Sequence, residues 1–320
     1  MDRRERIKNE LLVDPGTGAN LAGRSCQWTA DDDYSHLTHD ELDQTAKDIL
    51  AAGVDQLADA QELLWADGGR AVLLVFQAMD AAGKDSTIKH VMTGVNPQGV
   101  RVVSFKSPSS EELDHTFLWR TDNAAPARGE IGIFNRSHYE EVIALRVHPD
   151  WLDAQRLPTR DRSEQFWAER YEDVNAWERH LARNGTAVVK FFLHVSKAEQ
   201  KRRFMKRLDR PEKLWKFNAA DVVERRLWDD YMRAYDAAIT ATSTEHAPWY
   251  VIPADHKHVM QAMVASIIVD TINALDLAYP TVSAKDTKAN EKAQAELETE
   301  PDVDLAEPRE QKRKQEKSRA

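Results

Sequence analysis

The sequence predicts a three-layer α/β/α fold with a five-stranded parallel sheet, and three observations support this prediction. Short apolar runs rich in β-branched and aromatic residues recur along the chain, each run is continuously apolar, and a helical stretch separates it from the next. Continuous apolar strands joined by helices indicate a parallel sheet that is covered on both faces. The runs lie at residues 71–77, 100–105, 130–134, 186–195 and 247–254.

The helices are predicted from the spacing of their apolar residues. The first extends from Thr38 to Trp65, and Thr38 and Glu41 at its start have the spacing of a capping box. The remaining helices are expected at residues 84–92, 109–120, 136–146, 163–183, 196–209, 219–241 and 257–277. Strands and helices together predict one domain over residues 38–282.

Both ends of the chain differ from this domain. We expect residues 1–37 to be irregular, because DPGTGANLAG has neither the preceding strand nor the glycine spacing of a dinucleotide-binding fingerprint. Residues 283–320 are rich in charge and poor in large apolar side chains, which predicts a disordered tail.

Composition limits the class of protein. The chain has 320 residues, of which 42% are hydrophobic, and this is enough for a large core. A single cysteine, Cys26, excludes an internal disulfide, and with no signal-peptide pattern we expect a reducing cytoplasm. No apolar run approaches the roughly 18 residues of a membrane span. The formal net charge of -10 argues against a nucleic-acid partner.

A small-residue loop, QAMDAAGKDSTIKHV at 77–91, follows the first strand. Its backbone amides, the start of the next helix and Lys84 would cradle a phosphate group. Gly83 and Lys84 match GxxxxGK[ST], whereas Ala78 and Asp85 depart from it. We therefore expect a P-loop kinase-like fold. The phosphate ligands expected in this loop are Ala81, Ala82, Gly83, Asp85, Ser86 and Thr87.

Asp80 lies inside this loop, where a bridging Mg²⁺, or Mn²⁺ as the alternative, would relieve its repulsion of phosphate. In another interpretation the Asp80 carboxylate caps loop amides. The third strand is followed by Asn135, where P-loop enzymes normally carry an aspartate, so Glu130 and Glu140 are candidates to share the metal charge. The predicted metal ligands are Asp80, Asn135 and Glu130.

Arg136, directly after Asn135, would reach the same phosphates, since a guanidinium binds phosphate in a bidentate manner. The alternative is a helical ion pair between Arg136 and Glu140. Lys106, Arg120 and Arg128 fall near the expected ligand rim, although each alone is more often a solvated side chain.

Residues 196–220 contain nine Lys or Arg against three acidic residues, a local excess of six positive charges in an acidic protein. One interpretation is a solvated basic helix. The other is a mobile lid, because mononucleotide kinases place after this strand a segment that closes cations over phosphates. Its candidate phosphate ligands are Arg202, Arg203 and Lys216. Trp215, Phe217 and Trp228 would either stack on a base or pack in the core.

Four blocks together closely resemble the polyphosphate kinase 2 family: residues 77–109, 129–142, 190–203 and 241–257. The FNRSHYE version of the second block resembles the third class of this family, whose members phosphorylate both AMP and ADP. The resemblance covers about residues 38–278, and the family shares the departures at Ala78, Asp85 and Asn135.

The resemblance implies that Asp80, Gly83 and Lys84 orient and polarise the transferred phosphoryl group, that Asn135 and Arg136 stand in the Walker B place, and that the basic stretch up to Lys216 is the lid. Catalysis is expected from Asp80, Lys84 and Arg136. The expected nucleotide-binding residues are Arg120, Arg128, Asn135 and Glu140.

The predicted reaction is Mg²⁺-assisted, in-line transfer of the terminal phosphoryl group of inorganic polyphosphate to AMP or ADP, forming ADP and ATP, by a cytoplasmic homo-oligomer, a dimer or tetramer. Two alternatives stay open. One is an ATP-dependent nucleoside monophosphate kinase of the thymidylate kinase type, and the other is a non-catalytic polyphosphate-binding P-loop protein. Base specificity, chain-length preference and physiological direction do not follow from the sequence.

Overall fold

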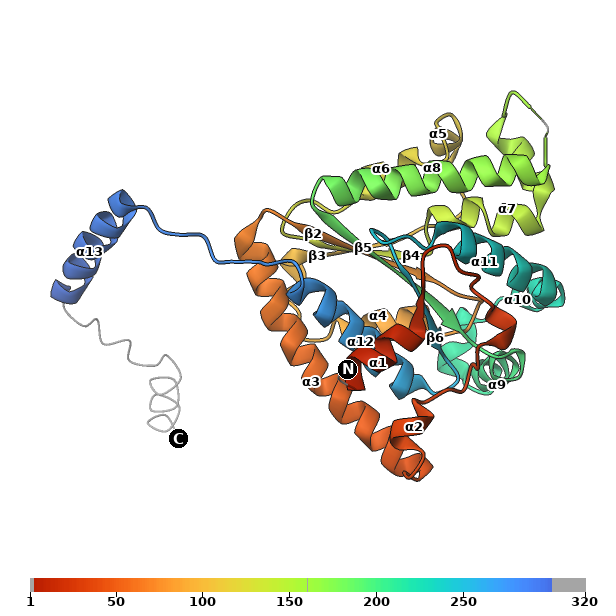
Figure 1. Cartoon of the computed structure of the whole chain (residues 1–320), viewed down its shortest axis with the longest axis horizontal. Coiled ribbons are helices and arrows are strands. Elements are labelled where there is room, and N and C mark those ends of the chain that lie inside the picture. Colours follow the sequence, from red (N-terminus) through yellow and green to blue (C-terminus); the bar gives the residue numbers. More distant parts are fainter. Residues whose placement is uncertain (1–2, 160, 301–320) are drawn as a thin grey trace, which may run out of the picture. The chain divides into compact units, whose positions relative to one another are not determined.

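The computed structural model describes residues 3–159 and 161–300, and the chain divides into two compact units, Met1–Tyr279 and Pro280–Ala320. In the first unit a central sheet lies between two layers of helices (Figure 1). Helices α3 (His39–Asp67), α4 (Lys84–Val91) and α12 (Lys257–Asn273) pack together on one side, and α8 (Glu164–Arg183) and α11 (Trp228–Thr242) on the other. The predicted α/β class is confirmed.

Among the described residues, six strands form one sheet in the order β1-β6-β5-β2-β4-β3. Five of them are parallel to one another and correspond to the predicted runs: β2 (Ala71–Gln77), β3 (Val100–Ser104), β4 (Ile131–Asn135), β5 (Thr186–His194) and β6 (Trp249–Pro253). The prediction missed β1 (Leu12–Val13), which pairs antiparallel with β6. Two residues are too few to show a period in the sequence.

Residues 1–37 were expected to be irregular, and this is wrong for much of the described segment. It contains α1 (Arg3–Leu11), β1, a 3₁₀ turn η1 (Leu21–Gly23) and α2 (Asp31–Tyr34). Arg4 pairs with Asp270 at 2.8 Å, and Leu11 and Leu21 are buried in the core of the first unit. Elements this short are stabilised by tertiary packing, which local periodicity does not reveal.

Three predicted helices are interrupted. The stretch 109–120 contains α5 (Ser110–Leu113) and the start of α6 (Trp119–Ala124), and 136–146 contains the 3₁₀ helix η3 (His138–Glu141) and the start of α7 (Ala144–Val147). The stretch 219–241 contains α10 (Ala219–Glu224), the 3₁₀ turn η6 (Arg225–Leu227) and α11. The second stretch also begins late, because Arg136 has a left-handed backbone with φ of 61° and the extended Ser137 caps η3. Further short helices are η2 (Pro97–Gly99) and η4 (Pro149–Gln155).

The second unit was expected to be disordered, but residues 284–299 form helix α13 (Ala284–Thr299). The hydroxyl of Ser283 caps it by accepting from the backbone amide of Asp286 at 3.2 Å. The helix buries no residue and is rich in Ala, Glu and Lys, which are strong helix formers. Intrinsic propensity therefore accounts for it, and residues 301–320 lie outside the described part of the chain.

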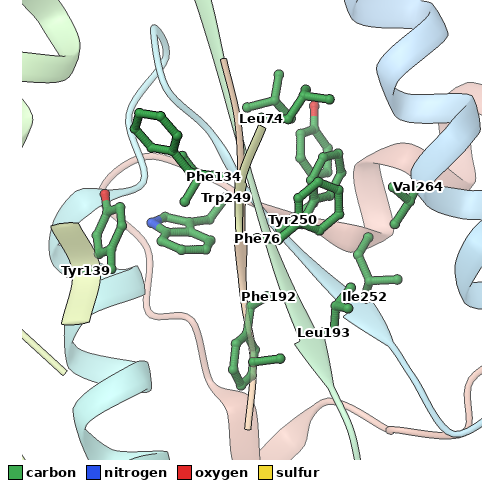
Figure 2. Close-up of a cluster of buried hydrophobic side chains, with 14 of the residues drawn as sticks. Leu74, Phe76, Phe134, Tyr139, Phe192, Leu193, Trp249, Tyr250, Ile252 and Val264 are labelled. Atoms are coloured by element: carbon green, nitrogen blue, oxygen red, sulfur yellow. The ribbon is translucent and has the colours of Figure 1, made fainter. Parts of the chain in front are cut away.

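The core lies on both faces of the sheet. Figure 2 shows Tyr139 and Trp249 on one side, and Tyr250, Ile252 and Val264 on the other. Trp249 and Tyr250 are neighbours on β6, so their opposite directions follow the alternation of a strand. Among the helices of the described residues, none is long and apolar enough to cross a membrane.

Candidate active site

The polar loops of the first unit meet where its parallel strands end. The loop 78–83 follows β2, Lys106 follows β3, Arg136 follows β4, helix α9 (Lys197–Leu208) follows β5, and Asp255 follows β6. In an open parallel sheet these carboxyl ends form the ligand-binding edge. The structure thus places the predicted phosphate loop and most of the other candidates at one edge.

The phosphate loop lies between β2 and the amino end of α4, as the sequence predicted. Gly83 is the N-cap of α4 with φ of 116°, and a Cβ there would lie 3.3 Å from the Met260 methyl carbon, so only glycine fits without strain. The ammonium group of Lys84 donates to the carbonyl oxygen of Ala78 at 2.8 Å. Burial, and then the nearby Arg136 guanidinium, lower the pKa of Lys84. The hydrogen bond to Ala78 thus holds the Lys84 side chain across the phosphate loop.

Arg136 and Asp80 form the ion pair that joins the β2 and β4 loops. A guanidinium nitrogen of Arg136 lies 2.8 Å from the Asp80 carboxylate, and the backbone amide of Arg136 donates to the carbonyl of Phe76 at 3.1 Å. The Glu140 carboxylate, more than any other cause, raises the pKa of Arg136 and keeps it cationic. Glu140 therefore acts on the site electrostatically, while Asp80 is the direct partner of Arg136.

Asn135 and Asp85 form a second link between the same loops, because the Asn135 amide donates to the Asp85 carboxylate at 2.7 Å. Asp85 was predicted as a phosphate ligand, but its carboxylate, which accepts this bond, would repel a phosphate, so only its backbone amide in the first turn of α4 can serve as one. Thr87 was also predicted as a phosphate ligand, and this is wrong. Its side chain is fully buried, and its amide donates to the Gly83 carbonyl inside the helix at 2.9 Å.

Two hollows meet at the phosphate loop and share Ala81, Gly83, Ser86 and Arg207 as lining residues. The first, which we call the basic hollow, has a volume of about 770 Å³. Its cationic and imidazole side chains are His39, Arg202, Arg203, Lys206, Arg207, His256, Lys257 and His258.

The second hollow, which we call the loop hollow, has a volume of about 630 Å³. Its charged and amide side chains are Asp80, Lys84, Asp85, Lys106, Asn135, Arg136, Arg207, Asn218 and Asp221. Burial, and then the nearby Asp80 carboxylate, raise the pKa of Asp221. Each hollow can hold a phosphate-bearing molecule against the same loop, since both contain cations next to Gly83 and Lys84.

The basic segment 196–220 forms α9 and the 3₁₀ helix η5 (Pro211–Lys216), which confirms its helical nature. Arg203 was predicted as a phosphate ligand, but its guanidinium donates to the carbonyls of Ala82 and Ala254, both at 2.5 Å. It therefore holds the phosphate loop in place. Arg202 pairs with Glu199 and faces the basic hollow. The side chain of the predicted ligand Lys216 lies outside the described part of the structure.

Three further predictions are corrected, two by the direction of the strands and one by burial. Arg128 and Glu130 precede β4, so they lie at the amino ends of the strands, opposite the loop. Five residues of β4 separate Glu130 from Arg136, roughly 20 Å along a strand, so Glu130 is not a metal ligand in this site. Arg120 is buried, and its guanidinium donates to the Glu141 carboxylate at 2.9 Å and to the Lys106 carbonyl at 2.8 Å. It supports the loop that carries Lys106.

The predicted aromatic residues divide between the core and the surface. Trp228 is buried, with Lys197 and Arg225 over its ring, so it packs in the interior. Phe217 meets Phe204 edge-on with 6.1 Å between ring centroids. Trp215 is 78% exposed and remains accessible for stacking.

The carboxylates of the loop hollow are the candidate ligands for a metal ion. Among residues 3–159 and 161–300, no group of three or more His, Cys, Asp or Glu side chains is arranged to hold a metal ion. A sparse set of carboxylates such as Asp80 and Asp85 nevertheless fits Mg²⁺, which takes one or two carboxylates and completes its shell with phosphate oxygens and water.

Sequence reasoning missed several residues of both hollows. His256, Lys257 and His258 follow β6 and belong to the strand-end edge, so the rule that identified Arg136 could also have identified them. Asp221 comes from α10 and His39 from the start of α3, far from any strand end. Only the fold brings these two toward the loop.

Comparison with known proteins completes the description of the site. Residues 40–279 match the family model described as polyphosphate kinase 2 (PPK2). An ADP-polyphosphate phosphotransferase of Rhodopseudomonas palustris is 52% identical over 234 residues, which cover 73% of this chain and 81% of that protein. An AMP/ADP-polyphosphate phosphotransferase of Meiothermus ruber is 49% identical over 237 residues, with 74% and 85% covered. The crystal structure of polyphosphate kinase 2 from Arthrobacter aurescens TC1 superposes with a TM-score of 0.79 at 36% identity and covers 91% of this chain and 97% of that one.

Proposed function

The chain belongs to the polyphosphate kinase 2 family, and from this premise we propose that it transfers the terminal phosphoryl group of inorganic polyphosphate to AMP or ADP. The observation that carries the proposal is that two hollows, each large enough for a phosphate-bearing ligand, share one loop at Gly83. A kinase needs donor and acceptor on opposite sides of the group that moves, with attacking and leaving oxygens in line.

The basic hollow suits the polyphosphate donor. Its lining combines four Arg or Lys side chains of α9 with Lys257 and three histidines, against the three carboxylates of Asp43, Glu199 and Asp255. This excess of cations suits a chain that carries one negative charge per phosphate. Arg202 and Lys206 are exposed toward solvent, so a long donor can extend out of the hollow. The excess of positive charge in residues 196–220 would thus bind the polyphosphate chain.

The loop hollow suits the nucleotide acceptor. Lys106 and Arg136 supply cations for its phosphate, while Asn135 and Asn218 add amides that can form hydrogen bonds. Both hollows contain three carboxylates, but this one has four Lys or Arg side chains and no histidine, whereas the basic hollow has five Lys or Arg side chains and three histidines. The loop hollow is therefore the less basic of the two, which favours a short phosphate group over a polyanion. The nucleotide phosphate would lie between Arg136 and the amino end of α4.

The residues of this chain supply positioning and charge for the transfer. Lys84 and the first amides of α4 hold the moving phosphoryl group, and Arg136 stabilises the charge that spreads over its oxygens. The Asp80 carboxylate orients Arg136 through their ion pair. The transfer proceeds in one step because the attacking oxygen belongs to the nucleotide, so the enzyme forms no covalent intermediate.

We propose Mg²⁺ as the cofactor, with Mn²⁺ as the alternative. The carboxylates of Asp80 and Asp85 and the side-chain oxygen of Asn135 would hold it. When bound, the ion would supply positive charge that shields the phosphate oxygens from one another.

The remaining parts of the proposal concern the setting of the reaction. We propose both AMP and ADP as acceptors, supported by the FNRSHYE block and by the name of the Meiothermus ruber relative. We also propose a cytoplasmic homo-oligomer, a dimer or tetramer, that does not bind nucleic acid. The single thiol of Cys26 supports a reducing compartment, and the formal net charge of -10 supports the absence of a nucleic-acid partner. Light scattering tests the oligomer.

Product analysis tests the proposal. The protein is incubated with polyphosphate, Mg²⁺ and one of AMP, ADP, GMP or GDP, and the nucleotides are separated by chromatography. ADP and ATP are the expected products from the adenine nucleotides. The ATP-dependent kinase alternative requires that polyphosphate fail as a donor while ATP succeeds, and the non-catalytic alternative requires that both fail.

A further inference from the structure

A buried ion-pair cluster lies behind the β4 loop, away from both hollows. Lys190, on the central strand β5, donates to the Glu178 carboxylate at 2.5 Å, to the Tyr139 hydroxyl at 2.9 Å and to the Thr242 carbonyl at 2.7 Å. Tyr139 donates to Glu178 at 2.9 Å, and the His138 ring lies 3.3 Å from the same carboxylate. We use the name buried ion-pair cluster for Tyr139, Glu178 and Lys190.

Burying this cluster costs free energy of desolvation, and the hydrogen bonds of its ammonium group are all formed. The side chains of Lys190 and Glu178 are fully buried, and Tyr139 is also fully buried. All three ammonium protons of Lys190 have acceptors, so the pair leaves no donor unsatisfied there. Apolar side chains of similar volume often stabilise a core as well as a buried ion pair does, so stability alone gives little reason for charges at this position.

The cluster is connected to the active site through one short segment. Tyr139 belongs to η3, which begins two residues after Arg136. Between them, the Ser137 hydroxyl accepts from the Tyr139 amide at 3.1 Å and from the Gln77 side chain at 3.3 Å. Arg136 itself has a left-handed backbone, a conformation that persists in a non-glycine residue only when its surroundings hold it.

We propose that the buried ion-pair cluster is a positioning device for Arg136: Glu178 and Lys190 hold Tyr139, and Tyr139 holds the turn that directs the Arg136 guanidinium at Asp80. The expected effect on kcat rests on the proposed function, but the role of the cluster in holding the turn at Arg136 does not. The three residues touch neither substrate nor the reacting atoms, so they are positioning residues and not catalytic ones.

The test begins with Tyr139→Phe, which removes one hydroxyl and keeps the ring. Because Arg136 acts on the transferring group, we expect kcat to fall about tenfold or more while both KM values stay within about twofold. The matched control is Tyr171→Phe on α8, which also loses a buried hydroxyl that accepts a hydrogen bond, from Arg146 at 3.1 Å, and should keep kcat. Equal kcat in Tyr139→Phe and wild type would overturn the proposal.

A second pair of measurements separates positioning from general weakening of the fold. The triple variant Tyr139→Phe, Glu178→Leu, Lys190→Met replaces every polar group of the cluster, so it should keep its melting temperature but show the same loss of kcat, because packing is retained while Arg136 is no longer held in its direction. Combined with Arg136→Lys, Tyr139→Phe should cost less than its separate effect, because both changes act on one interaction. Fully multiplicative losses would contradict the inference.

Amide hydrogen exchange of residues 136–141 tests the structural half without any substrate. Exchange should be faster in Tyr139→Phe and unchanged in Tyr171→Phe. If the wild-type protein fails to use polyphosphate, the proposed function is wrong, whereas this exchange difference still decides the positioning role. Unchanged exchange in Tyr139→Phe would refute it.

Discussion

The guanidinium of Arg136 lies 2.8 Å from the carboxylate of Asp80, although 56 residues separate them in the sequence. This ion pair joins the loop after β2, which the two hollows share, to the turn after β4. A cation that is already oriented by an adjacent carboxylate needs little rearrangement when a phosphoryl group arrives.

Lys84→Ala should lower turnover by at least about 100-fold, the scale of one lost preorganised charge at a reacting group. The measurement is kcat with polyphosphate and ADP in excess. Lys89→Ala is the matched control, because Lys89 is an exposed lysine on the same helix that lines neither hollow. Near wild-type turnover in a folded Lys84→Ala protein would remove Lys84 from the mechanism.

The pH dependence of kcat/KM should report the ionisation of Lys84. Burial lowers the pKa of Lys84, so this lysine loses its proton at a lower pH than an exposed lysine does. Activity should therefore decline on the alkaline side, with a midpoint below the pKa of an exposed lysine. In Lys84→Arg the guanidinium stays charged and the decline should disappear. A decline that persists unchanged in Lys84→Arg would assign it to another group.

Asp80→Asn should impair turnover and raise the Mg²⁺ concentration needed for half-maximal rate, since an amide binds Mg²⁺ more weakly than a carboxylate and orients Arg136 less strongly. The measurement is a Mg²⁺ titration of the initial rate. Asp55→Asn, at an exposed position on α3, is the control. An unchanged titration in Asp80→Asn would make Asp80 a structural residue.

The two hollows should respond separately to substitution. Lys206→Ala should raise KM for polyphosphate by roughly two- to fivefold and leave KM for the nucleotide unchanged, because an exposed charge contact contributes up to about 1 kcal/mol. Lys106→Ala should do the reverse. Lys201, an exposed residue of α9 outside both hollows, is the control for Lys206. A rise in both KM values in each variant would contradict separate donor and acceptor sites.

Much of this site could be predicted because its residues directly follow strands. Lys84 and Arg136 were found by that rule, which depends only on local sequence and on the geometry of parallel sheets. The same rule fails for Glu130, which stands before its strand, on the opposite edge of the sheet.

Other parts of the site depend on contacts that no local pattern contains. Arg203 is one of several cations on α9, and only its distance to the carbonyls of Ala82 and Ala254 shows that it holds the loop. Asp221 lies on α10, and only the fold brings this helix to the loop hollow. Strand β1 has two residues, which are too few to show a hydrophobic period in the sequence. Tertiary packing decided these features.

One measurement tests the central claim most directly: incubation of the purified protein with AMP, polyphosphate and Mg²⁺ in the complete absence of ATP, followed by separation of the nucleotides. The proposed function predicts that ADP appears at a rate proportional to enzyme concentration, and that Lys84→Ala abolishes most of it. No ADP from polyphosphate, together with ADP formed when ATP is supplied as the donor, would contradict it.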